Sequence, residues 1–238
     1  MRRTTSRLLA TSFALSAVVS FGLVTSTGPA DATGSAPAVV GLAYASGPVA
    51  GGQQMDIYGA NFDPNSTIAF GSEAATDVSC PYSFECTVTT PAAPGPETVY
   101  VTVTSDGMTS PTYTDYRASN GDYYADQYSY IYPTTITVTS PIEQRTPFAW
   151  YGLRLSATLT SSIGPVAGVK IQFGSKGGIV PLVDFSRVLC ISTTNAEGTA
   201  TCLDRQRYPF VILGEGYYAE FGGNSSYASA ATDTALIW

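Results

Sequence analysis

The chain has 238 residues, of which 44% are hydrophobic and only 12% are charged, and its formal net charge is −7 at pH 7. This negative balance argues against nucleic acid and anionic lipid as partners, because Lys and Arg lead binding to phosphates. The chain contains no histidine, which excludes Ser-His-Asp and Cys-His catalysis, His-ligated zinc and the usual general base near neutral pH.

Residues 1–32 have the pattern of a cleaved signal peptide. The first seven residues include three arginines, residues 8–24 are apolar but interrupted by Ser and Thr, and residues 30–32 (ADA) give a small-x-small cleavage site. The apolar stretch is shorter than the ~20 residues of a membrane-spanning helix. We therefore expect a mature chain that begins near Thr33, has no membrane span after processing, and is extracellular or at the cell surface.

Alternating apolar and polar residues predict β-strands throughout the mature chain. The alternation is clearest in residues 99–104, 153–159, 169–173 and 217–221, and a period of two places each apolar set on one face of a sheet. Turns rich in Gly, Pro, Asn and Asp separate the strands, as in β-sandwiches. The mature length suits two domains of about 100 residues each.

Residues 36–117 carry short motifs in a fixed order. The motifs are 37–42 (PAVVGL), 47–52 (GPVAGG), 57–62 (IYGANF), 68–71 (IAFG), 90–91 (TP) and 99–103 (VYVTV). In this order they resemble an IPT/TIG domain, an immunoglobulin-like β-sandwich. We expect Gly59 and Gly71 where a strand bends or a neighbouring backbone comes close. We expect Phe62 in the core and Asn61 bonded to its own turn.

Residues 118–133 form a predicted linker in which five tyrosines gather. They are Tyr123, Tyr124, Tyr128, Tyr130 and Tyr132. Our first interpretation is that these side chains pack between the modules or form an edge strand, with at least three of the five buried. The alternative is a ligand patch, in which the five tyrosines, with Asp122 and Asp126, bind a sugar or a peptide.

Residues 134–238 carry a second ordered set of motifs. The set is a Thr-rich start at 134–139, then 155–159 (LSATL), 165–173 (PVAGVKIQF), 195–198 (NAEG) and 217–227 (YYAEFGGNSSY). It resembles the bacterial Ig-like repeat domains of secreted and cell-surface proteins, with an insertion at 174–188. The two resemblances imply an all-β chain of two tandem immunoglobulin-like β-sandwiches after the signal peptide.

Four cysteines divide two and two between the modules, and we predict the disulfides Cys80–Cys86 and Cys190–Cys202. Small or apolar residues alternate on both sides of the turn 195–198, so the second pair predicts a β-hairpin with a covalent staple. Disulfides are typical of oxidising compartments. A zinc site of four thiolates would need reduced thiols and converging modules, so we expect no metal there.

Carboxylates are the remaining candidates for chemistry. Asp115, Asp122 and Asp126, with Asn120, lie near the linker and could hold calcium, although their spacing matches no EF-hand loop. No facing pair of acids is conspicuous, so a hydrolase that uses carboxylates alone is the third hypothesis. We predict no catalytic residue, no cofactor and no metal.

The main hypothesis is a secreted or surface-associated, non-enzymatic, bacterial protein with an adhesion, spacer or binding role. Its expected partner is an extracellular protein or a cell-wall glycan. The alternative is a carbohydrate-binding or enzyme-accessory module that uses the tyrosines of the predicted linker. Fold alone does not decide between these roles.

Overall fold

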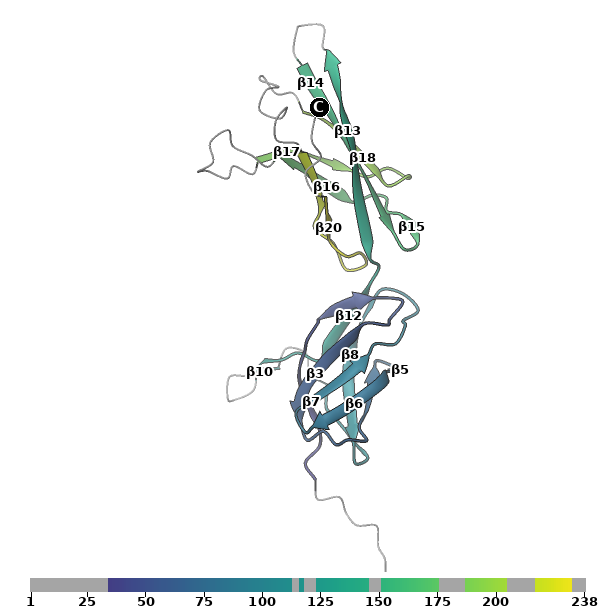
Figure 1. Cartoon of the computed structure of the whole chain (residues 1–238), viewed down its shortest axis with the longest axis vertical. Helices are drawn as coiled ribbons and strands as arrows, with labels where there is room; N and C mark the ends of the chain where they lie inside the picture. The colour runs from purple at the N-terminus through teal and green to yellow at the C-terminus, as the bar shows by residue number, and fades with distance from the viewer. Residues whose placement is uncertain are drawn as a thin grey trace, which may run out of the picture. The chain divides into compact units, whose positions relative to one another are not determined.

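The structure is a computed structural model that describes residues 34–112, 116–117, 123–145, 151–175, 187–204 and 217–232. Residues 1–33 lie outside these ranges, so the signal peptide and the mature start near Thr33 stay predictions. The described residues form strands and no helix, which confirms the predicted all-β class (Figure 1). They accordingly contain no helix that is long and apolar enough to cross a membrane.

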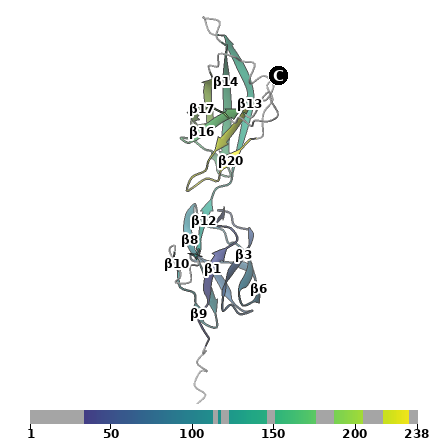
Figure 2. The same cartoon turned by 90° about the vertical axis from the view of Figure 1, so that its left-hand side faces the viewer.

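The first sandwich has two sheets that share one core. The first sheet has the order β1 (Ala38–Leu42), β3 (Gln54–Ala60), β7 (Glu85–Thr89) and β6 (Thr76–Tyr82). The second sheet has the order β2 (Ser46–Pro48), β12 (Gln127–Ile131), β8 (Glu97–Ser105), β4 (Thr67–Phe70) and β5 (Glu73–Ala74), with β9 (Met108–Thr109) paired to β8. Figure 2 shows β3 and β6 on one side of this sandwich and β8 and β12 on the other. The short strands β10 (Tyr116–Arg117) and β11 (Tyr123–Tyr124) pair separately.

Inward-facing residues of both sheets build the first core. Ile57 and Val88 come from the first sheet and Phe70 and Val103 from the second, and none of them is more than 1% exposed. Phe62 belongs to the same cluster and is 5% exposed. Its predicted place in the core is confirmed.

Gly59 and Gly71 each occupy a position that favours glycine, Gly59 because a neighbouring backbone lies close and Gly71 because of its backbone conformation. A Cβ at Gly59 would collide with the carbonyl oxygen of Ala38, which confirms the predicted close approach. Gly71 has a φ of 63°, a left-handed conformation that favours glycine. Asn61 differs from its prediction, because its side-chain Nδ2 donates to the carbonyl of Ala36 (3.0 Å) and not to its own turn.

Part of the predicted linker, residues 118–133, is a strand of the first sandwich. β12 pairs antiparallel with β8 and parallel with β2. Its Tyr128 and Tyr130 are 0% and 1% exposed and lie in the core, while Ser129 between them is half-buried. The expected edge strand is thus a strand, but β12 lies between β2 and β8 and not at an edge of the sheet. The alternation of Tyr128, Ser129 and Tyr130 is the pattern of a half-buried strand. The first sandwich therefore extends to the end of β12.

The second sandwich makes its first hydrogen bonds at the residue after β12. The backbone N–H of Tyr132 donates to the carbonyl of Ser226 (2.8 Å), and the carbonyl of Tyr132 accepts from the N–H of Ala228 (2.9 Å). The ring centroid of Tyr132 lies 5.8 Å from that of Tyr227. The described chain thus passes from one sandwich to the other across a single peptide bond.

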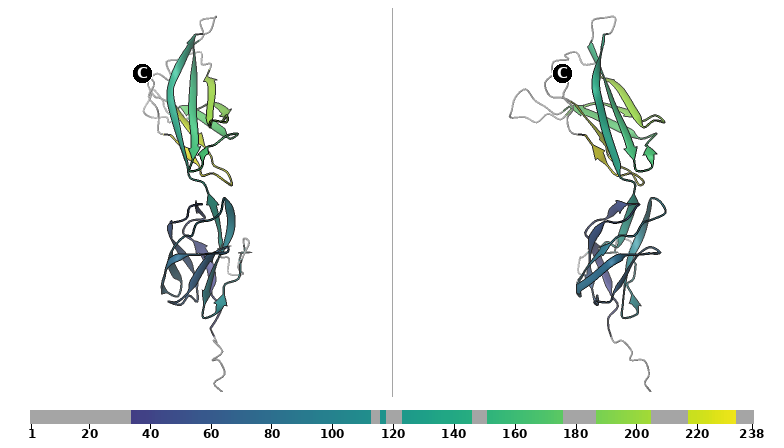
Figure 3. Two further views of the ribbon diagram at one scale, coloured as in Figure 1. Left: turned by 90° about the vertical axis from the view of Figure 1, so that its right-hand side faces the viewer. Right: turned by 45° about the vertical axis from the view of Figure 1, so that its right-hand side comes forward.

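The second sandwich also has two sheets, which the left panel of Figure 3 shows as separate layers. The first sheet contains β13 (Thr134–Arg145), β14 (Tyr151–Ser161), β15 (Gly164–Pro165) and β18 (Thr199–Asp204). The second sheet has the order β17 (Arg187–Thr193), β16 (Lys170–Ser175), β19 (Tyr217–Phe221) and β20 (Ala230–Ala231). Leu155 and Leu159 from the first sheet and Phe173 and Tyr217 from the second are each 0% exposed in its core.

The disulfide Cys190–Cys202 is confirmed, but the hairpin predicted around it is wrong. Cys190 lies on β17, which pairs with β16, and Cys202 lies on β18, which pairs with β14. The turn 195–198 therefore leads from one sheet to the other, and the disulfide joins the two sheets. Alternation predicted both strands correctly, yet it cannot tell whether two strands joined by a tight turn pair with each other.

Candidate functional site

The candidate site is built on the hairpin of β6 and β7 in the first sandwich. Cys80 and Cys86 form the other predicted disulfide, with their Cα atoms 4.1 Å apart and neither residue more than 4% exposed. Tyr82 pairs with Glu85 across the hairpin. Ser83 and the residue after it form the two-residue turn at its tip.

Backbone hydrogen bonds hold the tip against the end of β3 and the residues that follow it. The N–H of Gly59 donates to the carbonyl of Phe84 (2.9 Å), and the N–H of Phe62 donates to the carbonyl of Ser83 (3.0 Å). The disulfide constrains the base of the same hairpin. A partner would therefore meet a surface that is already ordered, which lowers the entropic cost of binding.

Two aromatic side chains project from this fixed backbone into solvent. Tyr82 is 57% exposed and Phe84 is 56% exposed. Their ring centroids lie 5.3 Å apart and their planes differ by 8°, so the rings stack. Burying an aromatic side chain contributes roughly 2–3 kcal/mol, and neither ring contributes that energy to the core. Exposed apolar groups that gather in one place are typical of interaction sites.

A third aromatic ring and a carboxylate extend the cluster across the sheet. Tyr58, which is 42% exposed, lies opposite Glu85 in the strand register. Glu85 in turn lies opposite Tyr82, so one cross-strand row reads Tyr58, Glu85, Tyr82. In the next row the hydroxyl of Thr87 donates to Oδ1 of Asp56 (2.9 Å). We call Tyr58, Tyr82, Phe84, Glu85 and Asp56 the aromatic-acidic face.

The part of the chain that carries the aromatic-acidic face is strongly acidic. Residues 34–131 contain ten carboxylates, one arginine (Arg117) and neither lysine nor histidine, a formal net charge of −9. Residues 132–238 contain seven acidic and seven basic residues. The first sandwich therefore carries the negative charge of the chain and attracts cations over a Debye length.

Sequence reasoning missed the aromatic-acidic face. The sequence predicted a disulfide between Cys80 and Cys86, and no role was assigned to the residues between them. The signal was the segment 80–86 (CPYSFEC), in which two aromatic residues occupy a loop too short to bury them. A disulfide loop that carries aromatic residues predicts that they are displayed on its outside.

The predicted ligand patch does not form an exposed surface where the structure describes it. Its members divide into a buried set (Tyr128, Tyr130 and Asp126), the half-buried Tyr132, and a set whose side chains lie outside the described residues (Tyr123, Tyr124 and Asp122). Two of the five tyrosines are thus buried and a third is half-buried. Burial of the hydroxyl raises the pKa of Tyr128 and of Tyr130, and for Tyr130 the neighbouring Tyr128, Glu97 and Glu73 raise it further.

The buried tyrosine hydroxyls differ in their hydrogen-bond partners. The hydroxyl of Tyr128 donates to Oε1 of Gln53 (2.9 Å). The hydroxyl of Tyr130 is buried and has no hydrogen-bond partner among the described residues. The hydroxyl of Tyr217 reaches the carbonyls of Ser156 (3.2 Å) and Thr139, and burial again raises its pKa.

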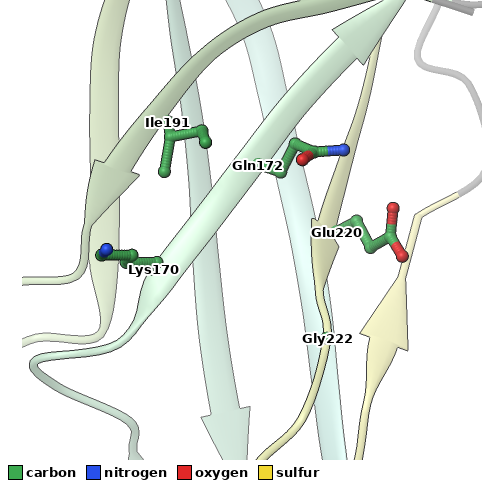
Figure 4. A pocket seen from close by; sticks show the side chains of 5 residues that line it. All are labelled: Lys170, Gln172, Ile191, Glu220 and Gly222. Carbon is green, nitrogen blue, oxygen red and sulfur yellow. The ribbon is translucent and has the colours of Figure 1, made fainter.

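A shallow depression of about 240 Å³ lies on the outer face of the second sandwich (Figure 4). Its lining residues are Lys170, Gln172, Ile191, Glu220 and Gly222. Gln172 lies between Ile191 and Glu220 in the strand register. The volume is below the roughly 300 Å³ at which small-molecule sites begin, and the lining contains a single carboxylate, Glu220, so it has no paired acids.

Metal ligation finds no support in the described part of the chain. Those residues contain no group of three or more His, Cys, Asp or Glu side chains placed to hold a metal ion. Of the calcium ligands considered in the sequence, Asp126 is buried. Asp115, Asn120 and Asp122 lie outside the described residues.

The two stapled β-sandwiches are those of immunoglobulin-like domains, and their disulfides point to an extracellular or surface protein. A model of one such family, the IPT/TIG domain, matches residues 37–118. This match confirms the resemblance predicted for the first module. The likeness of residues 134–238 to bacterial Ig-like repeats stays a prediction.

Several solved structures are similar to the chain at low identity. The fibronectin(III)-like modules of Clostridium thermocellum CbhA are 11% identical, with 78% of this chain and 87% of that chain covered and a TM-score of 0.31. The Yersinia pseudotuberculosis adhesin InvE is 16% identical, with 84% and 58% covered and a TM-score of 0.28. The plexin A4 extracellular region is 16% identical, with 72% and 13% covered and a TM-score of 0.34. These likenesses carry no information about a ligand.

The chain spans only 13% of the plexin A4 structure and 58% of the adhesin. None of the curated proteins matches it in sequence.

Proposed function

We propose that this protein is a non-enzymatic extracellular recognition or adhesion protein whose first sandwich binds a partner through the aromatic-acidic face. The stacked pair of Tyr82 and Phe84 carries the proposal, because both rings stay more than half exposed on a hairpin held by a disulfide. Rigid scaffolds that present side chains from loops and turns are a common basis of recognition.

Two features of the chain support a role outside the cell without catalysis. The signal-peptide pattern of residues 1–32 and the two disulfides fit a secreted or surface-held bacterial protein. A binding role also needs no general base, and the chain has no histidine to supply one. Glycan binding by the tyrosines of residues 118–133 has less support, because Tyr128 and Tyr130 lie in the core.

The test is retention of the mature chain on the surface of the producing cells. We expect the double variant Tyr82→Ser with Phe84→Ser to lose most of its binding, because it removes the exposed rings while leaving the disulfide and the core intact. The matched control is Ile191→Ser, which removes an equally exposed apolar side chain (58%) from the second sandwich. Equal retention of wild type, double variant and control would contradict the proposed function.

A further inference from the structure

We infer that the partner of the aromatic-acidic face is a protein segment that presents an exposed cationic side chain, above all arginine. This inference rests on the proposed function and adds the chemistry of the partner. It follows from three observations, namely the stacking of the rings, the place of the carboxylates, and the distribution of charge along the chain.

The ring geometry favours a cation over a sugar. Tyr82 and Phe84 cover one face of each other at a centroid distance of 5.3 Å with nearly parallel planes. Their free faces therefore point in opposite directions and do not form a continuous floor for a linear glycan. One free aromatic face is enough for a guanidinium or ammonium group, which needs a single ring within about 6 Å.

The carboxylates lie where such a cation would need them. Glu85 stands between Tyr58 and Tyr82 in one cross-strand row, and neighbours in a row have Cβ atoms about 5 Å apart. A planar guanidinium that stacks on a ring can also donate hydrogen bonds to a carboxylate beside it. Asp56 adds a second negative charge in the next row, where it accepts from Thr87.

The first sandwich supplies almost no cation of its own to compete for these carboxylates. From residue 34 to residue 116 the sequence contains no Lys, Arg or His. The uniform negative charge of the first sandwich would also speed the encounter with a basic partner and orient it. The second sandwich, whose charges balance, offers no such attraction.

The experiment measures binding of the mature chain to an Arg-rich synthetic peptide, with a peptide of the same length carrying Gln at every Arg position as the control probe. We expect the Arg-rich peptide to bind and the Gln peptide not to bind. The variant Tyr82→Ser with Phe84→Ser should weaken binding about tenfold, as expected for desolvated cation–π contacts. Glu85→Gln should weaken it about threefold.

A matched control variant distinguishes the effect of a carboxylate in the aromatic-acidic face from the effect of the net charge of the sandwich. Glu73 lies on β5 of the opposite sheet and is exposed, so Glu73→Gln removes the same charge at a distance. We expect Glu73→Gln to leave the affinity within about twofold of wild type at an ionic strength of about 0.15 M. Circular dichroism and retention of both disulfides would show that each variant is folded.

The outcomes distinguish this inference from the proposed function. If Glu73→Gln and Glu85→Gln weaken peptide binding equally, or if the aromatic variant binds the peptide as wild type does, the inference is wrong. If the aromatic variant loses retention on the cell surface while the Arg-rich peptide never binds, the proposed function stands and the cationic partner does not. If the aromatic variant loses no binding in any assay, both are contradicted.

Discussion

The two sandwiches share an architecture and differ in what they turn toward solvent. Among the described residues, the large exposed apolar side chains of the first sandwich are aromatic (Tyr44, Tyr58, Tyr82 and Phe84), and those of the second are aliphatic (Ile163, Val188 and Ile191). The first also carries the negative charge, while the charges of the second balance. Similar cores thus leave the outer faces free to serve different purposes, which is why fold does not decide function.

The disulfides differ in the same way. In the first sandwich the disulfide joins neighbouring strands of one sheet and fixes the hairpin that presents Tyr82 and Phe84. In the second sandwich the disulfide joins β17 to β18, which belong to different sheets, and so it holds the sandwich together. The first disulfide therefore orders an exposed hairpin, and the second links the two sheets that enclose a core.

The largest expected effect tests the assignment of β12 to the first sandwich. Tyr128→Ala should lower the free energy of unfolding by about 3–5 kcal/mol, because it empties a fully buried aromatic site. Hydrogen exchange followed by mass spectrometry should locate the loss of protection in the first sandwich alone. A change below about 1 kcal/mol, as for an exposed linker tyrosine, would contradict this assignment.

Removal of each disulfide sharpens the comparison of the staples. By the loop-entropy relation, Cys190→Ala with Cys202→Ala should cost about 2.9 kcal/mol and Cys80→Ala with Cys86→Ala about 2.4 kcal/mol. We expect the variant without Cys190–Cys202 to have a lower melting temperature of the second sandwich. The variant without Cys80–Cys86 should also bind the partner more weakly, because the hairpin is less constrained. Equal binding by both double variants would separate the hairpin from recognition.

Two buried tyrosine hydroxyls, one hydrogen-bonded and one without a described partner, should give a smaller contrast. Tyr217→Phe should cost about 1–2 kcal/mol, because it leaves the carbonyls that accept from this hydroxyl without their donor. Tyr130→Phe should be neutral or stabilising by up to about 1 kcal/mol, because it removes a buried hydroxyl that has no described partner. Urea unfolding of the two variants measures both changes, and a Tyr130→Phe variant clearly less stable than wild type would show that the hydroxyl is bonded.

The smallest expected effect concerns alkaline pH. Burial raises the pKa of Tyr128, Tyr130 and Tyr217 above the ordinary value of 10.0. Their contribution to the free energy of unfolding is therefore fully present below about pH 10. Above that pH the contribution is lost, because these hydroxyls ionise first in the unfolded chain. By about pH 10.5 each of these tyrosines should lower the free energy of unfolding by less than about 1 kcal/mol. The first sandwich contains two of the three, so its free energy of unfolding should fall more than that of the second. Unfolding at pH 9 and above measures the difference; an equal loss in both sandwiches would contradict it.

The sequence predicted the fold well wherever the signal was local. Alternation identified strands such as 99–104 and 217–221, the order of motifs identified the IPT/TIG domain, and the short spacings identified both disulfides. It failed where pairing is decided by distant residues. Whether β17 and β18 pair with each other depends on β14 and β16, and whether β12 is a strand depends on β8 and β2.

The candidate site was harder to predict for the same reason. Burial of Tyr128 and Tyr130 and exposure of Tyr82 and Phe84 reflect which residues the facing sheet covers. Composition alone favoured the tyrosine-rich segment 123–132. The cross-strand row that joins Tyr58 to the hairpin brings together residues more than twenty positions apart, which no local pattern reveals.

The most direct test of the central claim is a residue-by-residue map of where a cationic probe touches the chain. NMR spectra of the isotope-labelled mature chain, recorded while the Arg-rich peptide is added, supply this map. The account predicts shifts concentrated at Tyr58, Asp56 and the hairpin from Tyr82 to Glu85, with the outer face around Lys170 and Gln172 unchanged. Shifts confined to the second sandwich, or spread evenly over every carboxylate of the first, would contradict a recognition site on the aromatic-acidic face.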